Sequence, residues 1–244
     1  MRGRLFSLFA CLFALSFSLD SAYGANLAQQ RQYYDEAKRA LAKGDDGPYQ
    51  RYAAALQDYP LQPYLAYDEL TARLKSASNA EIEKFLAEHG DLPQASWMKL
   101  RWLRWLAERG EWQTFLNYYD PKLNFTELDC LYGQYLLSHG PATEANAAAE
   151  KLWLVGKSQP QACDVLFERW AARGQLSESL RWQRAKLAAE ARNYGLASHL
   201  VKNLPSRARQ GALLVEVAQN PALLSQTARF SPTDPAMADV VGLG

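Results

Sequence analysis

Cysteine, histidine and methionine are scarce in this sequence, each occurring three times in 244 residues. There is no HExxH motif and no closely spaced pair of cysteines, so the sequence carries no signature of a zinc site. It also lacks a glycine-rich phosphate loop and the GxSxG turn of serine hydrolases. We therefore expect no metal and no cofactor, although a Ser-His-Asp arrangement without such a signature stays open.

The N-terminus carries an unbroken apolar run, Leu5–Leu19, directly after two arginines. Ala22 and Gly24 then occupy the −3 and −1 positions of a cleavage after Gly24. This order is typical of a secretory signal peptide, so we assign residues 1–24 to one. The run is shorter than the roughly 20 residues that a membrane-spanning helix needs, and Cys11 follows too few apolar residues to favour a lipoprotein cleavage.

Neither sign of charge prevails in the rest of the chain. The whole sequence has 27 basic and 26 acidic side chains, and residues 1–24 hold Arg2, Arg4 and Asp20 among them. The remainder therefore carries equal numbers of basic and acidic side chains. A balanced charge provides no electrostatic surface for nucleic acid, so we expect no nucleic-acid partner.

Removal of the signal peptide leaves two cysteines, Cys130 and Cys163, in an exported chain where oxidation is allowed. We predict that they form a disulfide. Closing a loop of this length stabilises a fold by roughly 3–4 kcal/mol in the chain-entropy model. The alternative interpretation is a pair of unrelated buried thiols.

Residues that favour helices fill most of the chain, and no stretch shows the sustained alternation of a strand. The sequence therefore predicts an all-α protein. We expect helices at about 27–43, 48–58, 62–76, 79–89, 93–109, 111–118, 126–139, 143–155, 160–173, 177–192, 194–202, 206–219, 221–229 and 234–242.

Glycines mark the ends of several predicted helices, and most follow a basic residue. They are Gly44, Gly90, Gly110, Gly140, Gly174 and Gly195. We expect each to take the left-handed backbone that ends a helix, with the basic side chain facing the negative end of the helix dipole. His89 and His139 are two of these basic residues, so helix capping is favoured over metal binding. His199, the third histidine, lies far from both in the sequence.

The spacing of these glycines predicts a repeated architecture. Gly110, Gly140 and Gly174 recur at intervals close to the period of tetratricopeptide-like helical hairpins, which is about 34 residues. One hairpin cannot bury its apolar face, whereas stacked hairpins bury a continuous core. We therefore predict a right-handed α-superhelix (solenoid) of helical hairpins over residues 25–244.

Apolar side chains at helical spacing indicate which faces are buried. Two stripes stand out: Met98, Trp102, Trp105 and Leu106 in one helix, and Cys163, Leu166, Phe167 and Trp170 in another. The second stripe points Cys163 into the stack. The disulfide would then join its helix to the one that carries Cys130, across the helix between them.

Neighbouring carboxylates are the residues that a glycoside-cleaving site would need. The candidates are Asp45–Asp46, Asp68–Glu69 and Glu81–Glu83. All lie on polar faces or links, so solvated surface groups are the favoured interpretation, and we assign no catalytic residue.

Two further groups could contact a polymer. The basic side chains are Arg73, Lys75, Lys99, Arg101 and Arg104, and the tyrosines are Tyr59, Tyr64 and Tyr67. The first group could meet carboxylates of a polymeric substrate, and the second could stack on sugar rings. The favoured interpretation is again structural: basic side chains lying over tryptophan rings, and tyrosines in the core.

Three stretches together are similar to one family. They are "LQDYPLQPYLAYDEL" (56–70), "NAEIEKFLAEHGDLPQASWMKLRWLRWLAERGEW" (79–112) and "AAEKLWLVGKSQPQACDVLFERW" (148–170). They resemble the N-terminal helical domain of the soluble lytic murein transglycosylases of Gram-negative bacteria, and the resemblance extends over essentially all of the chain after residue 24.

This resemblance implies a periplasmic location and a U-shaped α-superhelix. Family members cleave the bond between N-acetylmuramic acid and N-acetylglucosamine without a metal, and they release 1,6-anhydro-muramyl products. A lysozyme-like C-terminal domain supplies their catalytic glutamate. The resemblance also implies the disulfide between Cys130 and Cys163.

The catalytic motifs of the family do not occur in this sequence. Glu178 precedes Ser179, but the Gly-Leu-Met-Gln and Ala-Tyr-Asn motifs are missing, so we carry over no catalytic residue. The last predicted helix reads as the opening of a hairpin that lacks its partner. It should therefore expose Met237, Val240 and Val241.

We accordingly expect the scaffold portion of a peptidoglycan lytic transglycosylase, inactive alone. Its expected partners are glycan strands and other cell-wall proteins, with no stable membrane span. The alternative is a free-standing periplasmic adaptor that binds a protein through its helical repeats.

Overall fold

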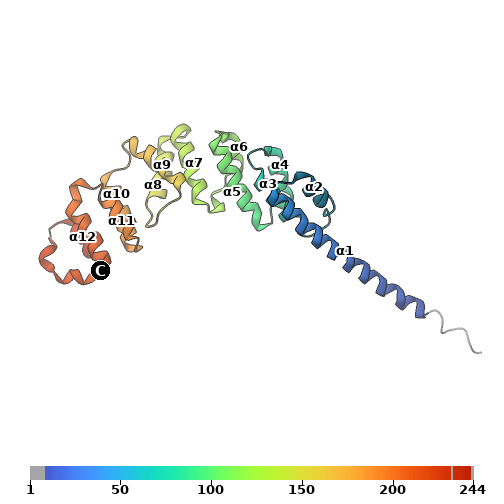
Figure 1. Ribbon diagram of the computed structural model, residues 1–244. Helices are drawn as coiled ribbons and strands as arrows, with labels where there is room; N and C mark the ends of the chain where they lie inside the picture. The colour runs from blue at the N-terminus through green and yellow to red at the C-terminus, as the bar shows by residue number, and fades with distance from the viewer. Residues whose placement is uncertain (1–8, 232, 243–244) are drawn as a thin grey trace, which may run out of the picture. The chain divides into compact units, whose positions relative to one another are not determined.

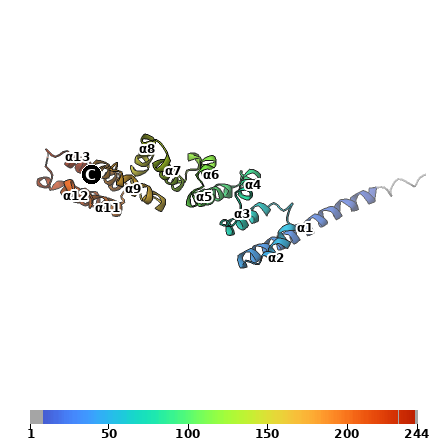
Figure 2. The same cartoon turned by 90° about the horizontal axis from the view of Figure 1, so that it is seen from above.

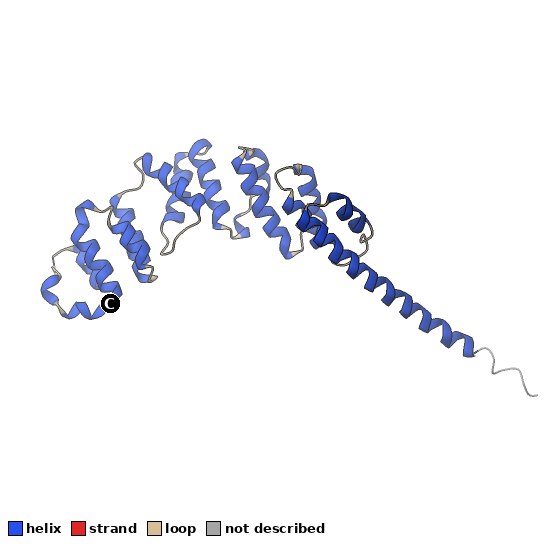
Figure 3. Ribbon diagram, in the orientation of Figure 1, coloured by secondary structure: helices blue, strands red, loops and turns tan. Residues whose placement is uncertain are grey.

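The computed structural model describes residues 9–231 and 233–242, with side chains described from residue 26 onwards. The described residues form thirteen α-helices and four short 3-10 helices, and no strand occurs among them (Figure 1, Figure 3). The α-helices are α1 (Phe9–Lys43), α2 (Asp46–Ala54), α3 (Gln62–Ala72), α4 (Asn79–His89), α5 (Pro93–Glu108), α6 (Trp112–Tyr118), α7 (Thr126–His139), α8 (Ala142–Trp153), α9 (Gln161–Ala172), α10 (Glu178–Glu190), α11 (Tyr194–Val201), α12 (Ala208–Gln219) and α13 (Pro235–Val241). The 3-10 helices are η1 (Pro121–Leu123), η2 (Pro205–Arg207), η3 (Pro221–Ser225) and η4 (Thr227–Arg229).

The chain divides into two compact units, Met1–Trp102 (unit 1) and Leu103–Gly244 (unit 2), with the boundary inside α5. Each unit is built of paired helices. In unit 1, α1 and α2 lie side by side in both views, and in unit 2 so do α7 and α8 (Figure 1, Figure 2). The predicted all-α class, built of helical hairpins, is confirmed.

Most predicted helices are confirmed within a few residues, and two differ in kind. The segment 221–229 forms η3 and η4 instead of an α-helix. Its backbone bonds run from Leu223 N to Asn220 O and from Gln226 N to Leu223 O, the tighter i→i+3 pattern of a 3-10 helix. At the N-terminus, residues 1–8 of the expected signal peptide lie outside the described residues, and α1 includes the rest of it.

Side-chain caps explain where several helices begin. Ser78 accepts a hydrogen bond from the Glu81 backbone N–H, and the Glu81 carboxylate accepts one in return from the Ser78 N–H, which together form a capping box at the start of α4. Ser177, Asn193 and Asp234 accept similar bonds at the starts of α10, α11 and α13. Each cap satisfies a backbone donor that the helix leaves unpaired.

The prediction for the six glycines is confirmed at three of them. Gly44, Gly110 and Gly174 have φ angles of 73°, 72° and 71°, the left-handed backbone that glycine adopts without strain. Gly90 and Gly140 have negative φ, and Gly195 lies inside α11. At Gly90 and Gly140 close packing is the reason for glycine, because a Cβ would stand 2.7 Å from Leu86 O and 2.8 Å from Leu136 Cδ2.

One core cluster of unit 1 joins α1, α2 and the link before α3 through tyrosines, and α3 contributes Leu65. Tyr33 pairs with Tyr52 at 5.6 Å between ring centroids, and Tyr34 pairs with Tyr59 at 5.5 Å. Tyr59 is 8% exposed, so the structural interpretation of this tyrosine is confirmed. Aromatic pairs at such separations stabilise a fold beyond the area they bury.

The core of unit 2 contains the predicted disulfide. Cys130 on α7 is bonded to Cys163 on α9, with 4.9 Å between their Cα atoms, and both side chains are fully buried. The stripe of Leu166, Phe167 and Trp170 faces the same core, as predicted. Gly133 allows the close approach of α7 and α9, since a Cβ there would stand 2.9 Å from Leu166 Cδ2.

The expected exposure of the last helix is wrong for two residues. Met237 and Val240 are 3% and 0% exposed, whereas Val241 is 46% exposed as predicted. The reason is that α13 folds back onto α12. Asp239 fixes it there by accepting hydrogen bonds from Trp182 Nε1 and Lys186 Nζ, each at 2.7 Å.

Candidate functional site

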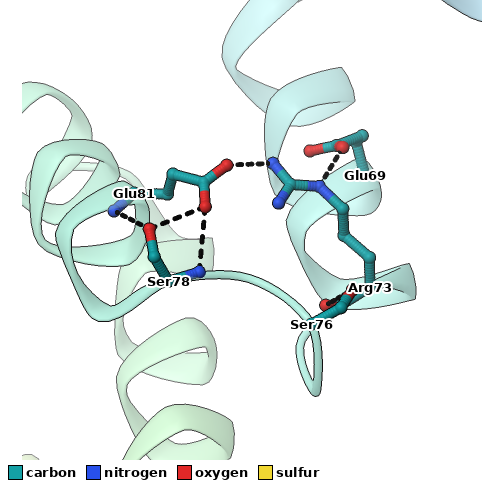
Figure 4. Close-up of polar contacts among 5 residues, drawn as sticks. All are labelled: Glu69, Arg73, Ser76, Ser78 and Glu81. Atoms are coloured by element: carbon teal, nitrogen blue, oxygen red, sulfur yellow. Dashed lines mark hydrogen bonds and ion pairs between the residues drawn. The ribbon is translucent and has the colours of Figure 1, made fainter.

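Two of the six candidate carboxylates, Glu69 and Glu81, meet around one arginine (Figure 4). The Arg73 guanidinium donates from Nε to Glu69 at the end of α3 and from Nη2 to Glu81 Oε1 on α4, the latter at 2.8 Å. The other Glu81 oxygen accepts bonds from Ser78 N at 2.9 Å and Ser78 Oγ at 2.7 Å. Ser76 Oγ donates to Arg73 O at 3.0 Å. The cluster thus joins α3 to the capping box of α4.

The electrostatics of this cluster argue against acid catalysis. Hydrogen bonds from Arg73, then from the Ser78 backbone and hydroxyl, lower the pKa of Glu81 to about 2. A general acid needs a carboxyl whose pKa is raised towards neutrality. Glu81 is therefore an ionised structural carboxylate.

Tyr49 of α2 lies beside the same cluster. It lines a pocket of about 460 Å³ together with Asp46, Glu69 and Arg73. Partial burial, then the charge of Glu69, raises the pKa of Tyr49 to about 12. A phenol with a raised pKa stays protonated near neutrality, so Tyr49 is a neutral hydrogen-bonding group and cannot act as a base there.

The predicted capping histidines stand where the sequence placed them. His89 and His139 are the last residues of α4 and α7. The His139 ring stacks on Tyr135 at 4.7 Å, and its Nδ1 lies 3.2 Å from Tyr135 O. In the described part of the chain no three His, Cys, Asp or Glu side chains gather as a metal site would require.

The other candidates take part in local contacts. Arg104 forms an ion pair with Glu127 at 2.6 Å in unit 2. Glu178 accepts a hydrogen bond from Ser206 N at 3.0 Å, which ties α10 to η2. Tyr64 and Tyr67 are partly buried on α3. Basic side chains do lie over tryptophan rings in this chain: Arg109 lies 5.6 Å from the Trp105 ring centroid, and Arg207 lies 5.4 Å from that of Trp182.

A row of aromatic rings runs along α6 and α7 of unit 2. Its members, called here the aromatic row, are Trp112, Phe115, Tyr119, Tyr132, Tyr135 and His139. Tyr119 stacks on Tyr132 at 4.7 Å, and Trp112 lies 5.5 Å from Tyr135. Phe115 is fully buried, whereas Trp112 and the tyrosines are partly exposed.

Tyr119 is held in this row by a hydrogen bond. Its hydroxyl donates to Asp129 Oδ1 at 2.8 Å. Burial, then this bond, raises the pKa of Tyr119, so the phenol stays protonated and its ring position stays fixed. The row is therefore a pre-formed aromatic surface.

A pocket of about 620 Å³ opens beside Trp112, one member of the aromatic row. Its polar lining includes Arg104, Glu127, Gln134, Gln161 and Arg169. Gln134 is positioned by a bond of 2.7 Å from its Nε2 to Ala162 O. We call this the Trp112 pocket. A partly exposed indole face next to planar amide and guanidinium groups is the combination that suits a sugar ring, which offers an apolar face and several hydroxyls.

The Trp112 pocket was not predicted from the sequence. The signal was present, because Trp112 and Phe115 stand at i and i+3, as do Tyr132 and Tyr135. Each pair alone reads as core packing. Only the placement of α6 against α7 brings the two pairs into one row.

Comparison with known proteins gave one family-model match. The model described as Cucumovirus coat protein matches residues 133–217. This stretch is about a third of the chain, from within α7 to within α12. Similarities to other proteins extend much further.

Two curated proteins named soluble lytic murein transglycosylase are similar over most of the chain. The Escherichia coli protein is 32% identical over 227 residues, which are 93% of this chain and 35% of that protein. The Salmonella typhimurium protein is 32% identical over 197 residues, or 80% of this chain and 30% of that protein. The chain thus spans about a third of the length of the curated relatives it matches.

Solved structures give the same result. The lytic transglycosylase Slt of Pseudomonas aeruginosa, solved as an inactive mutant, matches with a TM-score of 0.82 and 69% identity over 86% of this chain and 34% of that one. The Escherichia coli 70-kDa soluble lytic transglycosylase matches with a TM-score of 0.75 and 30% identity over 89% of this chain and 35% of that one. Within the described residues, no helix is both long enough and apolar enough to cross a membrane. The resemblance seen in the sequence is confirmed. Most of this chain is homologous to a segment that makes up about a third of the length of a soluble lytic murein transglycosylase.

Proposed function

We propose that this chain is the helical scaffold portion of a periplasmic peptidoglycan lytic transglycosylase, which holds glycan strands and does not cleave them by itself. The observation that carries the proposal is the 69% identity to the Pseudomonas aeruginosa enzyme over 86% of the chain. In this proposal residues 1–24 are a signal peptide, and residues 25–244 are the helical scaffold.

Three features of the chain support a binding role. The Trp112 pocket combines an aromatic face with amide and guanidinium groups, as a sugar-binding surface requires. Glu81, which pairs with Arg73, is an ionised structural carboxylate. The sequence also contains none of the motifs that the resemblance assigns to the catalytic domain.

Sedimentation with purified murein sacculi tests binding and cleavage together. We expect the protein to sediment with sacculi and to release no anhydro-muropeptides into the supernatant, as measured by chromatography. Release of such products would overturn the proposal of inactivity. If the chain does not bind sacculi but binds one protein from an envelope extract in stoichiometric amount, the alternative function, a protein-binding adaptor, would be supported instead.

A matched pair of variants tests the Trp112 pocket. Trp112→Ala should weaken sacculus binding by roughly tenfold, the order of effect of removing one aromatic anchor from a binding surface. Trp97→Ala removes an exposed indole, 52% accessible, from α5 in unit 1 and should leave binding unchanged. Equal losses in both variants would show that the Trp112 pocket is not the binding surface.

A further inference from the structure

A second pocket of unit 2 is separate from the Trp112 pocket. It has a volume of about 630 Å³ and lies among α8, α9, α10 and α11. Its lining includes Trp153, Asp164, Phe167, Glu168, Arg184 and His199. This volume is in the range of pockets that hold small molecules.

Arg184 of α10 is the buried charge in this pocket. Its side chain is 5% exposed. The guanidinium lies 4.3 Å from the ring centroid of Trp153 and 5.2 Å from that of Phe167. The two rings thus fix its plane by cation–π contacts.

Arg184 has unused hydrogen-bonding capacity. Its Nε is buried and has no hydrogen-bond partner among the described residues. A buried donor without an acceptor costs free energy that a purely structural arginine would avoid. Burial lowers the pKa of Arg184 to about 10, although the negative charge of Asp164 acts in the opposite direction. Because this pKa is still well above neutral pH, the guanidinium stays charged there. A planar cation with an unpaired Nε–H donor is suited to a carboxylate.

The rest of the pocket lining carries two acidic side chains and one further arginine, Arg181. Asp164 and Glu168 are exposed and lie one helical turn apart on α9. They would repel a ligand that is only anionic, and they would attract an ammonium group. The pocket therefore offers an anion site at Arg184 and a cation site at Asp164 and Glu168.

We propose that this pocket binds a small zwitterion, an amino acid or short peptide with a free carboxylate and a free ammonium group. The carboxylate pairs with Arg184, and the ammonium group faces Asp164 and Glu168. The aromatic rings of Trp153 and Phe167 hold Arg184 in place and cover the apolar part of the ligand. This binding is independent of any sugar bound at the Trp112 pocket.

Titration with three related probes tests the charge pattern. The probes are the dipeptide alanyl-alanine, its N-acetyl derivative, which is only anionic, and its C-terminal amide, which is only cationic. We expect alanyl-alanine to shift the NMR resonances of Trp153 Nε1–H and Arg184 Nε–H, with each blocked probe binding about tenfold or more weakly. Equal binding of all three, or no shift with any of them at about 50 mM, would overturn the proposal.

Substitutions in the chain complete the test. Arg184→Gln should abolish the shifts, whereas Arg173→Gln, which changes an exposed arginine directly after α9 that lines neither pocket, should leave them unchanged. Asp164→Asn changes an exposed side chain and does not disturb the core. It should weaken the dipeptide severalfold and leave the N-acetyl probe unaffected or slightly stronger. Equal weakening of both probes by Asp164→Asn would contradict the assignment even if Arg184→Gln does not fold.

Discussion

The core of each unit is stabilised by a different set of contacts. Buried tryptophans whose indole N–H groups have fixed acceptors stand in the core of unit 2, with Trp153 bonded to Leu180 O, Trp170 to Asn146 and Trp182 to Asp239, and a disulfide crosses the same core. In unit 1, tyrosine pairs join α1 to α2 and to the link before α3, and the ion pairs of Arg73 join α3 to α4. Unit 1 also has a buried tryptophan with a fixed acceptor, Trp102, which donates to Asn79 Oδ1. The stability of unit 2 should therefore depend on the oxidation of its disulfide. Acid should weaken both units, because the pKa is lowered for Glu81 in unit 1 and for Asp234 and Asp239 in unit 2.

Trp170→Ala should have the largest effect, and that effect should fall on unit 2. The Trp170 side chain is 1% exposed, and its Nε1 donates to Asn146 Oδ1 at 3.2 Å. Loss of a buried indole destabilises by about 3–5 kcal/mol, because a cavity and an unpaired amide remain. Urea denaturation followed by circular dichroism measures this loss. The control is Trp97→Ala, which removes a 52% exposed ring and should lower the free energy of unfolding by less than about 1 kcal/mol. Similar losses of stability in Trp170→Ala and Trp97→Ala would refute the contrast between core and surface.

Removal of the disulfide should have the next largest effect. The double substitution Cys130→Ala and Cys163→Ala opens a loop of 33 residues in sequence separation. The chain-entropy model gives a loss of about 3–4 kcal/mol. Denaturation of the oxidised parent, the reduced parent and the double variant measures it. We expect the last two to agree, and a reduced parent as stable as the oxidised one would contradict the role of the bond.

Two glycines with the same backbone should respond alike in the two units. Gly44 in unit 1 and Gly174 in unit 2 have φ angles of 73° and 71°, and a Cβ would meet no atom within 4 Å at either. Alanine at either position is therefore strained only by its own backbone, at about 1 kcal/mol. Thermal unfolding of both variants measures this. Clearly unequal losses would show that unit context, and not the left-handed backbone, determines the effect.

Helix positions were predictable from the sequence because their signals are local. The α4 boundaries follow from Ser78 and Glu81 at one end and His89 at the other, all within a few residues of the helix. The disulfide was predictable because two cysteines remain after an expected export step. Burial of Met237 and Val240 was not predictable, since it depends on α13 folding back onto α12.

The candidate sites were less predictable than the fold. The Trp112 pocket and the second pocket of unit 2, which contains Arg184, are each lined by residues from three or more helices far apart in sequence. Arg184 stands in "RWQRAKL", where an arginine reads as a solvated surface residue. Only the packing of α8 and α9 against α10 encloses it between two rings.

Glu81→Gln should have the smallest effect at neutral pH and should be distinguished by its pH dependence. The parent carboxylate has a pKa of about 2 in the folded chain and an ordinary value of 4.5. A lowered pKa means that ionised Glu81 contributes stability that is fully present above about pH 5 and is lost as the pH falls towards about 2. Glutamine keeps an acceptor for Ser78 at the start of α4 and loses only the charge that faces Arg73.

The stability difference between the parent and Glu81→Gln should therefore be constant from about pH 5 upwards and should vanish near pH 2. It should also shrink with added salt, because both side chains are substantially exposed. Denaturation of both proteins at a series of pH values measures this difference, with Glu83→Gln, at a partly exposed side chain of α4, as the control. A difference that persists unchanged at pH 2 would mean that Glu81 acts through helix capping alone. The ion pairs of Arg73 would then not be what makes unit 1 sensitive to pH.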